Sequence, residues 1–222
     1  MIPDAHLLNQ ALEDQTNTVL LVLTFFNRGG LLLENDKVQS REIALGKRRK
    51  IYDNISHNEY GDRIRHFFHK WISGKRSVSV ISLYYPVNSE MNPLTLIDYP
   101  NTQGKITCLP IVTDKNSPLI FKAWSPGRDM VAGRYGIPVP DNDHIVTPDL
   151  VICPLLAYDD KGMRLGYGGG FYDRTIRHLR RNKQTRYMGL AFSEQKSYHD
   201  LPSEEHDVPL DAILTESGIS NF

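Results

Sequence analysis

The stretch that decides the fold is LVICPLLAYDDKGMRLGYGGGFYDR, residues 150–174. Residues 150–157 are apolar throughout, which is typical of a short strand that is buried on both faces of a sheet. Four glycines fall within five positions, Gly166 and Gly168 to Gly170, so the backbone there can adopt positive φ angles without strain. From Phe171 to about Arg181 the apolar side chains recur with helical spacing. The stretch therefore predicts a buried strand, a glycine loop and a helix in succession.

Predicted strands and helices alternate on both sides of this stretch. Apolar and β-branched runs predict strands over residues 77–84, 106–112, 119–124, 187–191 and 212–215. Helical spacing and capping residues predict helices over residues 41–53, 60–72 and 92–99. Strands that alternate with helices indicate a Rossmann-like α/β fold in three layers, with a mostly parallel sheet between helices on both faces. Ligands of such folds bind at the carboxyl ends of the strands, which is where the glycine loop is expected.

Residues 1–40 differ in character from the rest of the chain. They contain the apolar run VLLVLTFF, residues 19–26, followed by Gly29, Gly30 and a polar stretch. We expect residues 41–222 to form a single domain and residues 1–40 to be an extension of unknown role. Three interpretations of the extension stay open: a poorly ordered segment, a docking segment, or translated sequence upstream of the true start.

The composition limits the classes of partner. The chain has 26 Lys and Arg and 26 Asp and Glu among 222 residues, so its overall charge does not attract it to nucleic acid. The longest apolar run, residues 19–26, is too short to cross a bilayer and lacks the preceding basic residues of a signal peptide. Cys108 and Cys153 match no metal-binding or redox spacing, and as small core residues they fit a reducing compartment. We expect a cytoplasmic monomer with no nucleic-acid or membrane partner.

The junction between the glycine loop and the helix that begins near Phe171 suits an anion. The first N–H groups of a helix lack acceptors within the helix and carry partial positive charge, so phosphate binds there readily. Asp173 adds the carboxylate that a nucleotide–Mg²⁺ complex needs, because the metal is shared between phosphate and protein oxygens. The pattern is not a Walker A motif, since no Gly-Lys-Ser/Thr follows. Two plainer alternatives stay open: a tight turn without a ligand, and an Asp173 that serves only the helix dipole.

Two histidine-containing groups are weaker candidates. His66 and His69 lie one helical turn apart, but no third residue at a suitable spacing accompanies them as a metal ligand. His206 and Asp207 resemble a catalytic dyad, but we expect them to be a pair in a loop near the edge of the sheet.

The stretch PLLAYDDKGMRLGYGGGFYDR, residues 154–174, resembles the signature of the 5-formyltetrahydrofolate cyclo-ligases, also called methenyltetrahydrofolate synthetases. SVSVISLYYPVNSE, YGIPVP and HDVPLDAIL support the resemblance in the expected order, at residues 77–90, 135–140 and 206–214. The similarity covers residues 41–216. It implies an ATP- and Mg²⁺-dependent ligase of folate and one-carbon metabolism, which converts 5-formyltetrahydrofolate to 5,10-methenyltetrahydrofolate and releases ADP and phosphate. ATP would phosphorylate the formyl oxygen, and so turn a poor leaving group into a good one before N10 attacks the formyl carbon.

The resemblance also implies roles for individual residues, carried over by position. Arg164 and Asp173 are the expected catalytic residues. The expected ATP contacts are Arg41, Arg164, Leu165, Gly166, Tyr167, Gly168, Gly169, Gly170, Phe171 and Tyr172. The expected folate contacts are Tyr85, Glu90, Tyr135, Tyr167 and Phe171. Mg²⁺ would be held by Asp173, with Asp211 as a second acid.

One departure from the family pattern bears on the nucleotide. The family often has an arginine four residues after the first basic residue of the N-terminal helix, where this chain has Leu45. The next basic cluster is Lys47 to Lys50, so which basic residue of this helix contacts the nucleotide is left open. Two other functions also stay open: another ATP-dependent phosphotransferase that uses the same loop, and a non-catalytic protein that binds nucleotide or folate.

Overall fold

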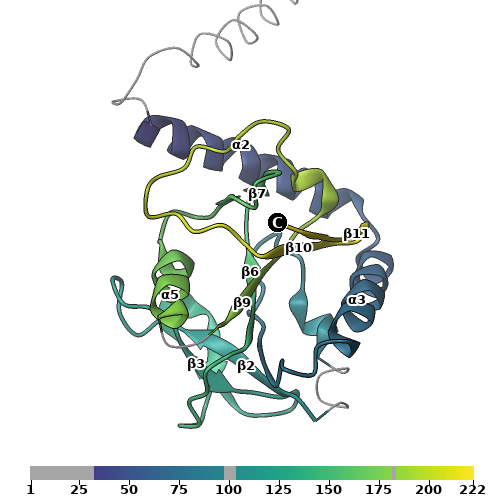
Figure 1. Cartoon of the computed structure of the whole chain (residues 1–222), viewed down its shortest axis with the longest axis vertical. Helices are drawn as coiled ribbons and strands as arrows, with labels where there is room; N and C mark the ends of the chain where they lie inside the picture. The colour runs from purple at the N-terminus through teal and green to yellow at the C-terminus, as the bar shows by residue number, and fades with distance from the viewer. Residues whose placement is uncertain (1–32, 98–103, 182–183) are drawn as a thin grey trace, which may run out of the picture. The chain divides into compact units, whose positions relative to one another are not determined.

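The computed structural model describes residues 33–97, 104–181 and 184–222 (Figure 1). Contacts divide the chain into two units, residues 1–39 and residues 40–222. Most of the expected extension lies outside the described residues, and the single domain expected from residue 41 onward stays a prediction. The second unit contains the whole of the central sheet.

The central sheet has seven strands in the order β11-β10-β9-β6-β1-β2-β3. Their bounds are Val80–Ser82 (β1), Ile106–Ile111 (β2), Ile120–Ala123 (β3), Leu150–Pro154 (β6), Arg186–Leu190 (β9), Ala212–Thr215 (β10) and Gly218–Asn221 (β11). The five inner strands are parallel to one another, whereas β3 and β11 pair antiparallel at the two edges. This confirms the mostly parallel sheet expected from the sequence. The edge strand β11 has no counterpart among the expected strands.

The helices lie on both faces of the sheet, which confirms the expected three layers. The two faces are covered by α3 (His57–Ser73) and α5 (Phe171–Arg180), and α2 (Leu33–Asn54) precedes α3 in the chain. Successive residues of a strand face opposite sides of a sheet. In β6, Ile152 belongs to the core cluster that contains Phe68 of α3, and Cys153 to the cluster that contains Ile176 of α5. Figure 1 shows α3 and α5 on opposite sides of the strands accordingly. Burial of β6 on both faces explains why its residues are apolar without alternation.

Several expected elements are shorter than predicted or are split. The strand expected over residues 150–157 ends at Pro154, and the chain continues as β7 (Ala157–Tyr158), which pairs antiparallel with β8 (Arg164–Leu165). The helix expected over residues 92–99 is a short 3₁₀ helix, η1 (Pro93–Leu96). The last two residues of that expected helix lie in the segment 98–103, outside the described residues.

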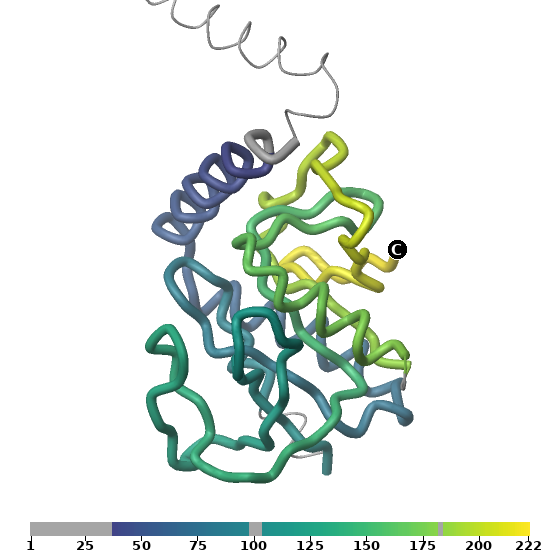
Figure 2. The backbone as a smooth tube through the Cα atoms, turned by 90° about the vertical axis from the view of Figure 1, so that its left-hand side faces the viewer, coloured from purple at the N-terminus to yellow at the C-terminus, as the bar shows by residue number. Residues whose placement is uncertain are grey.

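A second hairpin lies in the connection from β3 to β6. It consists of β4 (Met130–Ala132) and β5 (Pro138–Pro140), joined by the short 3₁₀ turn η2 (Arg134–Gly136). Figure 2 shows this connection, coloured teal to green, as a loop at the side of the sheet. A third 3₁₀ turn, η3 (Ser193–Gln195), follows β9.

Both cysteines are free and buried, as expected for core residues. Burial raises the pKa of the Cys153 thiol to about 12. A thiol that stays protonated at neutral pH is a poor nucleophile and a poor metal ligand.

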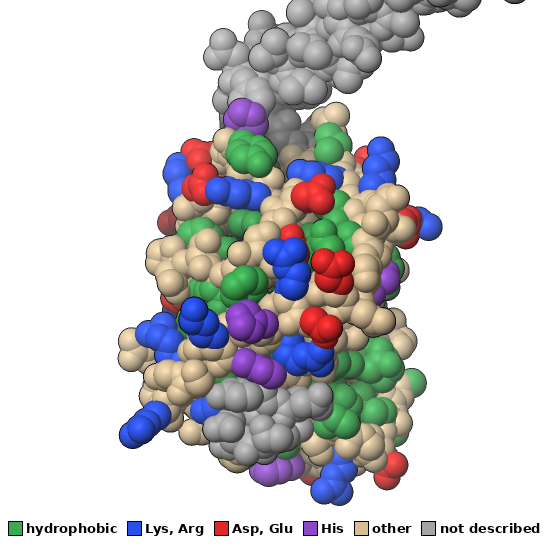
Figure 3. Space-filling view, turned by 90° about the vertical axis from the view of Figure 1, so that its right-hand side faces the viewer, with side chains coloured by type: hydrophobic (Ala, Val, Ile, Leu, Met, Phe, Trp, Pro, Cys, Tyr) green, Lys and Arg blue, Asp and Glu red, His purple; other side chains and the backbone are tan. Residues whose placement is uncertain are grey.

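The surface over α3 is mixed in charge. Basic, acidic and histidine side chains are interspersed on this face (Figure 3). In the described part of the chain, no helix combines the length and the apolar character that a membrane crossing requires.

Candidate functional site

The glycine loop connects β8 to α5 and has the backbone conformation that glycine favours. Gly168 and Gly170 have positive φ angles of 92° and 63°. Gly170 is the N-cap residue of α5, and no side chain caps the first turn of this helix. The first N–H groups of α5 are therefore left to an external acceptor, which is the arrangement expected for an anion.

Arg41 of α2 lies against the glycine loop. Its Nε atom donates a hydrogen bond to the carbonyl oxygen of Gly166 over 3.1 Å. A Cβ atom at Gly168 would lie 3.1 Å from the guanidinium carbon of Arg41, so a side chain at position 168 would force the arginine to move. The structure thus places the expected N-terminal basic residue at the loop.

Arg164 and Asp173 contact each other. Nη2 of Arg164 donates to Oδ1 of Asp173 over 2.7 Å, and Nη1 donates to the carbonyl oxygen of Val208 over 2.6 Å. The N–H of Val208 donates to the same Oδ1 over 3.2 Å. Oδ2 of Asp173 has no hydrogen-bond partner among the described residues. The two expected catalytic residues therefore lie together, with Arg164 holding one oxygen of Asp173 and the other oxygen free for a cation.

Asp211 lies elsewhere. Nη2 of Arg180, in the last turn of α5, is 3.0 Å and 3.1 Å from its two carboxylate oxygens. Oδ2 of Asp211 also accepts the N–H of Tyr187, at the start of β9, over 2.7 Å. Asp173 is in the first turn of α5, about 10 Å before Arg180 along the helix axis. The structure thus places the two expected Mg²⁺ ligands near opposite ends of α5 and does not bring them together.

A different acidic residue reaches the neighbourhood of Asp173. Asp207 directly precedes Val208, whose backbone contacts both Arg164 and Asp173. Its Oδ2 atom accepts the N–H of Glu204 over 2.8 Å. Potential ligand atoms of Glu204, His206 and Asp207 lie within 4.8 Å of one another, whereas His66 and His69 belong to no such group of three among the described residues. Asp207 lies in the segment HDVPLDAIL, residues 206–214, directly before Val208.

Tyr135 and Phe171 form an aromatic pair beside the loop. Tyr135 is 64% exposed and lies in the turn between β4 and β5, with a positive φ of 61° that is unusual for a residue other than glycine. Its ring centroid is 6.3 Å from that of Phe171, the first residue of α5. Two of the expected folate contacts, distant in sequence, are thus neighbours in the structure.

Glu90 lies in a buried turn after β1. Its side chain is buried, and Oε2 accepts the N–H of Val87 over 3.0 Å. The hydroxyl of Tyr167, in the glycine loop, is near enough to this carboxylate to favour its charged form. Burial raises the pKa of Glu90, and the Val87 N–H, Arg48 and Tyr167 partly offset this rise. The structure therefore joins two more of the expected folate contacts.

Arg48 is a residue of this site that the sequence analysis missed. It lies two helical turns after Arg41 on the same face of α2, and it is fully buried. Nη2 of Arg48 donates to the hydroxyl oxygen of Tyr167. Within the basic cluster of residues 47–50 the sequence gives no sign that this arginine differs from its neighbours.

The structure says less about the three remaining expected contacts, which are Leu165, Tyr172 and Tyr85. Leu165 is buried in a small core cluster with Ala44 and Leu156, so any nucleotide contact it makes uses its backbone. Tyr172 packs against the core cluster that contains Cys153. Tyr85 is 37% exposed and follows β1 at the carboxyl end of that strand.

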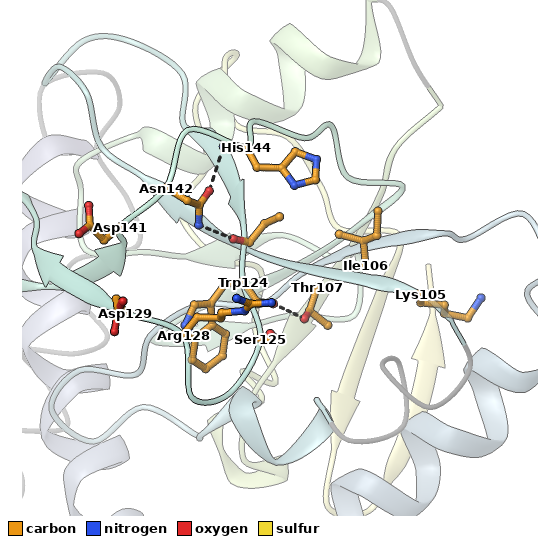
Figure 4. Close-up of a pocket in the computed structure, with 11 residues that line it drawn as sticks. Lys105, Ile106, Thr107, Trp124, Ser125, Arg128, Asp129, Asp141, Asn142 and His144 are labelled. Carbon is orange, nitrogen blue, oxygen red and sulfur yellow. Dashed lines mark hydrogen bonds between the residues drawn. The ribbon is translucent and has the colours of Figure 1, made fainter.

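A separate cavity of about 480 Å³ lies on another part of the sheet (Figure 4). It is bounded by the start of β2 and the end of β3, and its wall includes Lys105, Thr107, Trp124, Arg128, Asn142 and His144. The start of β2 is at the amino-end edge of the parallel strands, opposite the edge from which the chain enters the glycine loop. None of the expected site residues lines this cavity.

The sheet and the glycine loop define a protein of the mostly parallel α/β class with a glycine-rich junction before a helix. Comparison with known proteins extends this conclusion. The model of the 5-formyltetrahydrofolate cyclo-ligase family matches residues 34–216, so this chain belongs to that family. The match confirms the family, the enzyme class and the cyclo-ligase activity expected from the sequence, while the roles of individual residues stay predictions.

Individual relatives agree with the family match. The 5-formyltetrahydrofolate cyclo-ligase of Haemophilus influenzae is 37% identical over 146 residues, which are 63% of this chain and 77% of that protein. The cyclo-ligase of Mycolicibacterium smegmatis is 30% identical over 81% of this chain and 93% of its own length. The solved structure of Aquifex aeolicus 5,10-methenyltetrahydrofolate synthetase has a TM-score of 0.64 at 26% identity, with 83% of this chain and 92% of that one covered.

Proposed function

We propose that this chain converts 5-formyltetrahydrofolate to 5,10-methenyltetrahydrofolate with MgATP as co-substrate, releasing ADP and phosphate. The observation that carries the proposal is that the glycine loop lies next to expected nucleotide contacts and also next to expected folate contacts. The Gly166 carbonyl of this loop accepts a hydrogen bond from Arg41, on the expected nucleotide side, and the Tyr167 hydroxyl lies beside Glu90, on the expected folate side. A loop shared in this way would hold the γ-phosphoryl group close to the formyl oxygen, and phosphoryl transfer depends chiefly on such positioning.

The nucleotide phosphates would bind at the start of α5. The backbone N–H groups of the glycine loop and of the first helical turn supply donors, and the helix dipole supplies partial positive charge. Arg41 adds a full positive charge beside Gly166 and Gly168. Among the basic residues of α2, we therefore assign the nucleotide contact to Arg41.

The residues present fit a magnesium ion. Mg²⁺ in nucleotide sites is bound by one or two carboxylates together with phosphate oxygens. Asp173 supplies one carboxylate oxygen that no described residue occupies, at the edge of the loop. Asp207, rather than Asp211, is the second candidate because it adjoins Val208. Bound there, Mg²⁺ would neutralise charge that develops on the phosphate oxygens, and Arg164 would keep Asp173 oriented.

The folate would occupy the other side of the loop. The exposed ring of Tyr135 and the ring of Phe171 offer a stacking surface for an aromatic ring system. Glu90 offers a buried carboxylate to N–H donors, and Tyr85 adds an exposed aromatic ring at the end of β1. Bound between these groups, the formyl oxygen would face the phosphates and be shielded from water.

The test is incubation of the purified protein with MgATP and 5-formyltetrahydrofolate, followed in the near ultraviolet, where the methenyl product absorbs. We expect an increase in absorbance that requires both ATP and Mg²⁺. ATP consumption without this absorbance would indicate another phosphotransferase. Binding of either ligand without ATP consumption would indicate a non-catalytic binding protein.

We also propose that the protein is a cytoplasmic monomer. The bacterial relatives and the lack of a membrane-spanning helix in the described residues are compatible with this location. A relative from Arabidopsis thaliana, 35% identical over 138 residues, is named as mitochondrial. Light scattering coupled to gel filtration tests the oligomeric state, and a mass near twice 25.3 kDa would contradict the proposal.

A further inference from the structure

Arg48 is a charged side chain with almost no access to water. Only 1% of it is exposed, and it is the largest side chain among those buried most completely in the described residues. A buried guanidinium is costly unless each of its donors finds an acceptor. The partners of Arg48 therefore indicate why the fold retains a charge at this position.

All three nitrogen atoms of the Arg48 guanidinium donate hydrogen bonds. Nε donates to the hydroxyl of Ser89 over 3.2 Å, Nη1 to the carbonyl oxygen of Leu155 over 3.0 Å, and Nη2 to the hydroxyl oxygen of Tyr167. The guanidinium carbon also lies 5.3 Å from the centroid of the Tyr167 ring. These partners come from the turn that carries Glu90, from the carboxyl end of β6 and from the glycine loop. One side chain of α2 thus fixes three segments of the site relative to one another.

The direction of these hydrogen bonds has a chemical consequence. Arginine has donors only, so the Tyr167 oxygen must accept from Arg48. The proton of the Tyr167 hydroxyl is then available to the Glu90 carboxylate, which lies beside that hydroxyl and next to Ser89, another partner of Arg48. The result is a directed chain from Arg48 through Tyr167 to Glu90.

We propose that Arg48 is a positioning residue for folate binding: it fixes the Tyr167 hydroxyl as a donor to Glu90, and so holds Glu90 as an ionised acceptor for N–H groups of the folate. This inference rests on the proposed function, in which Glu90 and Tyr167 contact the folate. Each nitrogen atom of Arg48 already donates a hydrogen bond within the protein and the side chain is fully buried, so it would touch neither substrate.

The groups that act on Glu90 come from four elements. They are Arg48 of α2, Tyr84 after β1, Tyr167 of the loop and Tyr172 of α5. Arg48 provides the positive charge among these groups, and the tyrosines stay neutral because burial raises their pKa values. Loss of Arg48 removes an interaction that lowers the Glu90 pKa, so Glu90 would protonate at a higher pH.

The test compares three variants with a matched control. Arg48→Lys keeps the charge but loses the planar fork of donors, Arg48→Met removes the charge, and Tyr167→Phe removes only the hydroxyl. The control is Arg49→Met, because the Arg49 side chain is 79% exposed and its ion pair with Asp53 lies on the surface. Steady-state rates are measured against each substrate across the pH range, with direct binding of 5-formyltetrahydrofolate and the melting temperature of each variant.

We expect the KM and Kd for 5-formyltetrahydrofolate to rise about tenfold or more in Arg48→Lys and Tyr167→Phe, with the KM for ATP changed less than about twofold. In Arg48→Met the acid limb of the pH profile of kcat/KM for the folate should move to higher pH. Arg49→Met should match the wild type in all these measurements.

Two results would overturn the inference. One is unchanged folate binding and an unchanged pH profile in folded Arg48→Lys and Tyr167→Phe. The other is an equal rise of the KM for both substrates, which would indicate a general structural role. If Arg48→Met does not fold, Arg48→Lys decides, since it keeps the positive charge and changes only the geometry of the donors. A wild type that neither binds the folate nor forms the methenyl product would instead refute the proposed function.

Discussion

Arg164 and Asp173 form an ion pair in which Nη2 of the arginine lies 2.7 Å from Oδ1 of the carboxylate. The side chains are 6% and 19% exposed, so the pair is largely protected from solvent. Oδ1 accepts two hydrogen bonds, from Arg164 and from the Val208 N–H, whereas Oδ2 accepts none from the described residues. A carboxylate held by one oxygen is oriented by its neighbours but keeps the other oxygen for a cation.

Asp173→Asn should lower kcat by about 100-fold or more, because the amide is a much weaker ligand for Mg²⁺. The variant should still fold, since α5 keeps its packing face, although loss of the charged partner of Arg164 costs about 1–3 kcal/mol. The methenyl absorbance and thermal melting measure the two effects. Asp62→Asn is the control, because Asp62 forms only an exposed ion pair with Arg65 on α3. A near-normal rate in Asp173→Asn would remove Asp173 from the metal site.

Asp211→Asn should change stability but not the requirement for Mg²⁺. It weakens an acceptor of the Tyr187 N–H and an ion pair to Arg180 that is more than a third exposed, so the loss should be at most about 1 kcal/mol. Asp207→Asn should instead raise the Mg²⁺ concentration for half-maximal rate about tenfold. A titration of the initial rate with Mg²⁺ separates the variants. A raised Mg²⁺ requirement in Asp211→Asn, with an unchanged requirement in Asp207→Asn, would assign the metal to Asp211 instead.

Tyr135→Gly should raise the KM for 5-formyltetrahydrofolate about tenfold or more, because the aromatic surface next to Phe171 is lost. Its melting temperature should be equal to or higher than that of the wild type, since glycine adopts the positive φ at this position without strain. Tyr135→Phe is the matched control and should bind folate like the wild type. Equal folate KM values for the glycine variant and the wild type would show that the ring does not contact the substrate.

Glu90→Gln should weaken folate binding and change how stability depends on pH. Burial raises the pKa of Glu90, so the folded state holds this proton more tightly than the unfolded chain does. The contribution of Glu90 to stability therefore falls as the pH rises from below the ordinary carboxyl pKa of about 4.3 through the raised value. The glutamine variant lacks this loss, so its free energy of unfolding relative to the wild type should increase over the same window. Urea unfolding at several pH values measures the difference, and parallel curves would contradict the raised pKa.

The sequence was sufficient for six of the seven strands of the sheet, all but β11, and for the main helices, because their signals are local. The apolar runs at Leu150–Pro154 and Ala212–Thr215 are strands, and the apolar spacing after Phe171 is a helix. Elements that depend on distant partners could not be predicted in this way. The strands β7 and β8 have two residues each and exist because Ala157 pairs with Leu165 and Tyr158 with Arg164 across the turn between them.

Two site residues show different limits of sequence reasoning. The position of Asp211 was predictable in principle, because a residue directly before a parallel strand lies at the amino-end edge, away from the glycine loop. Arg48 was not predictable, because a run of four basic residues is most often a solvated helix surface. Only the packing of α2 on the rest of the unit distinguishes Arg48, which is buried, from Arg49, which is exposed.

Arg41 and Gly166 touch each other across 125 positions of the chain, and Val208 supplies the backbone groups that hold Arg164 and Asp173. A nascent chain on the ribosome would therefore recognise neither ligand until nearly all of it had emerged. Products of premature termination before Val208 should be inert rather than partly active.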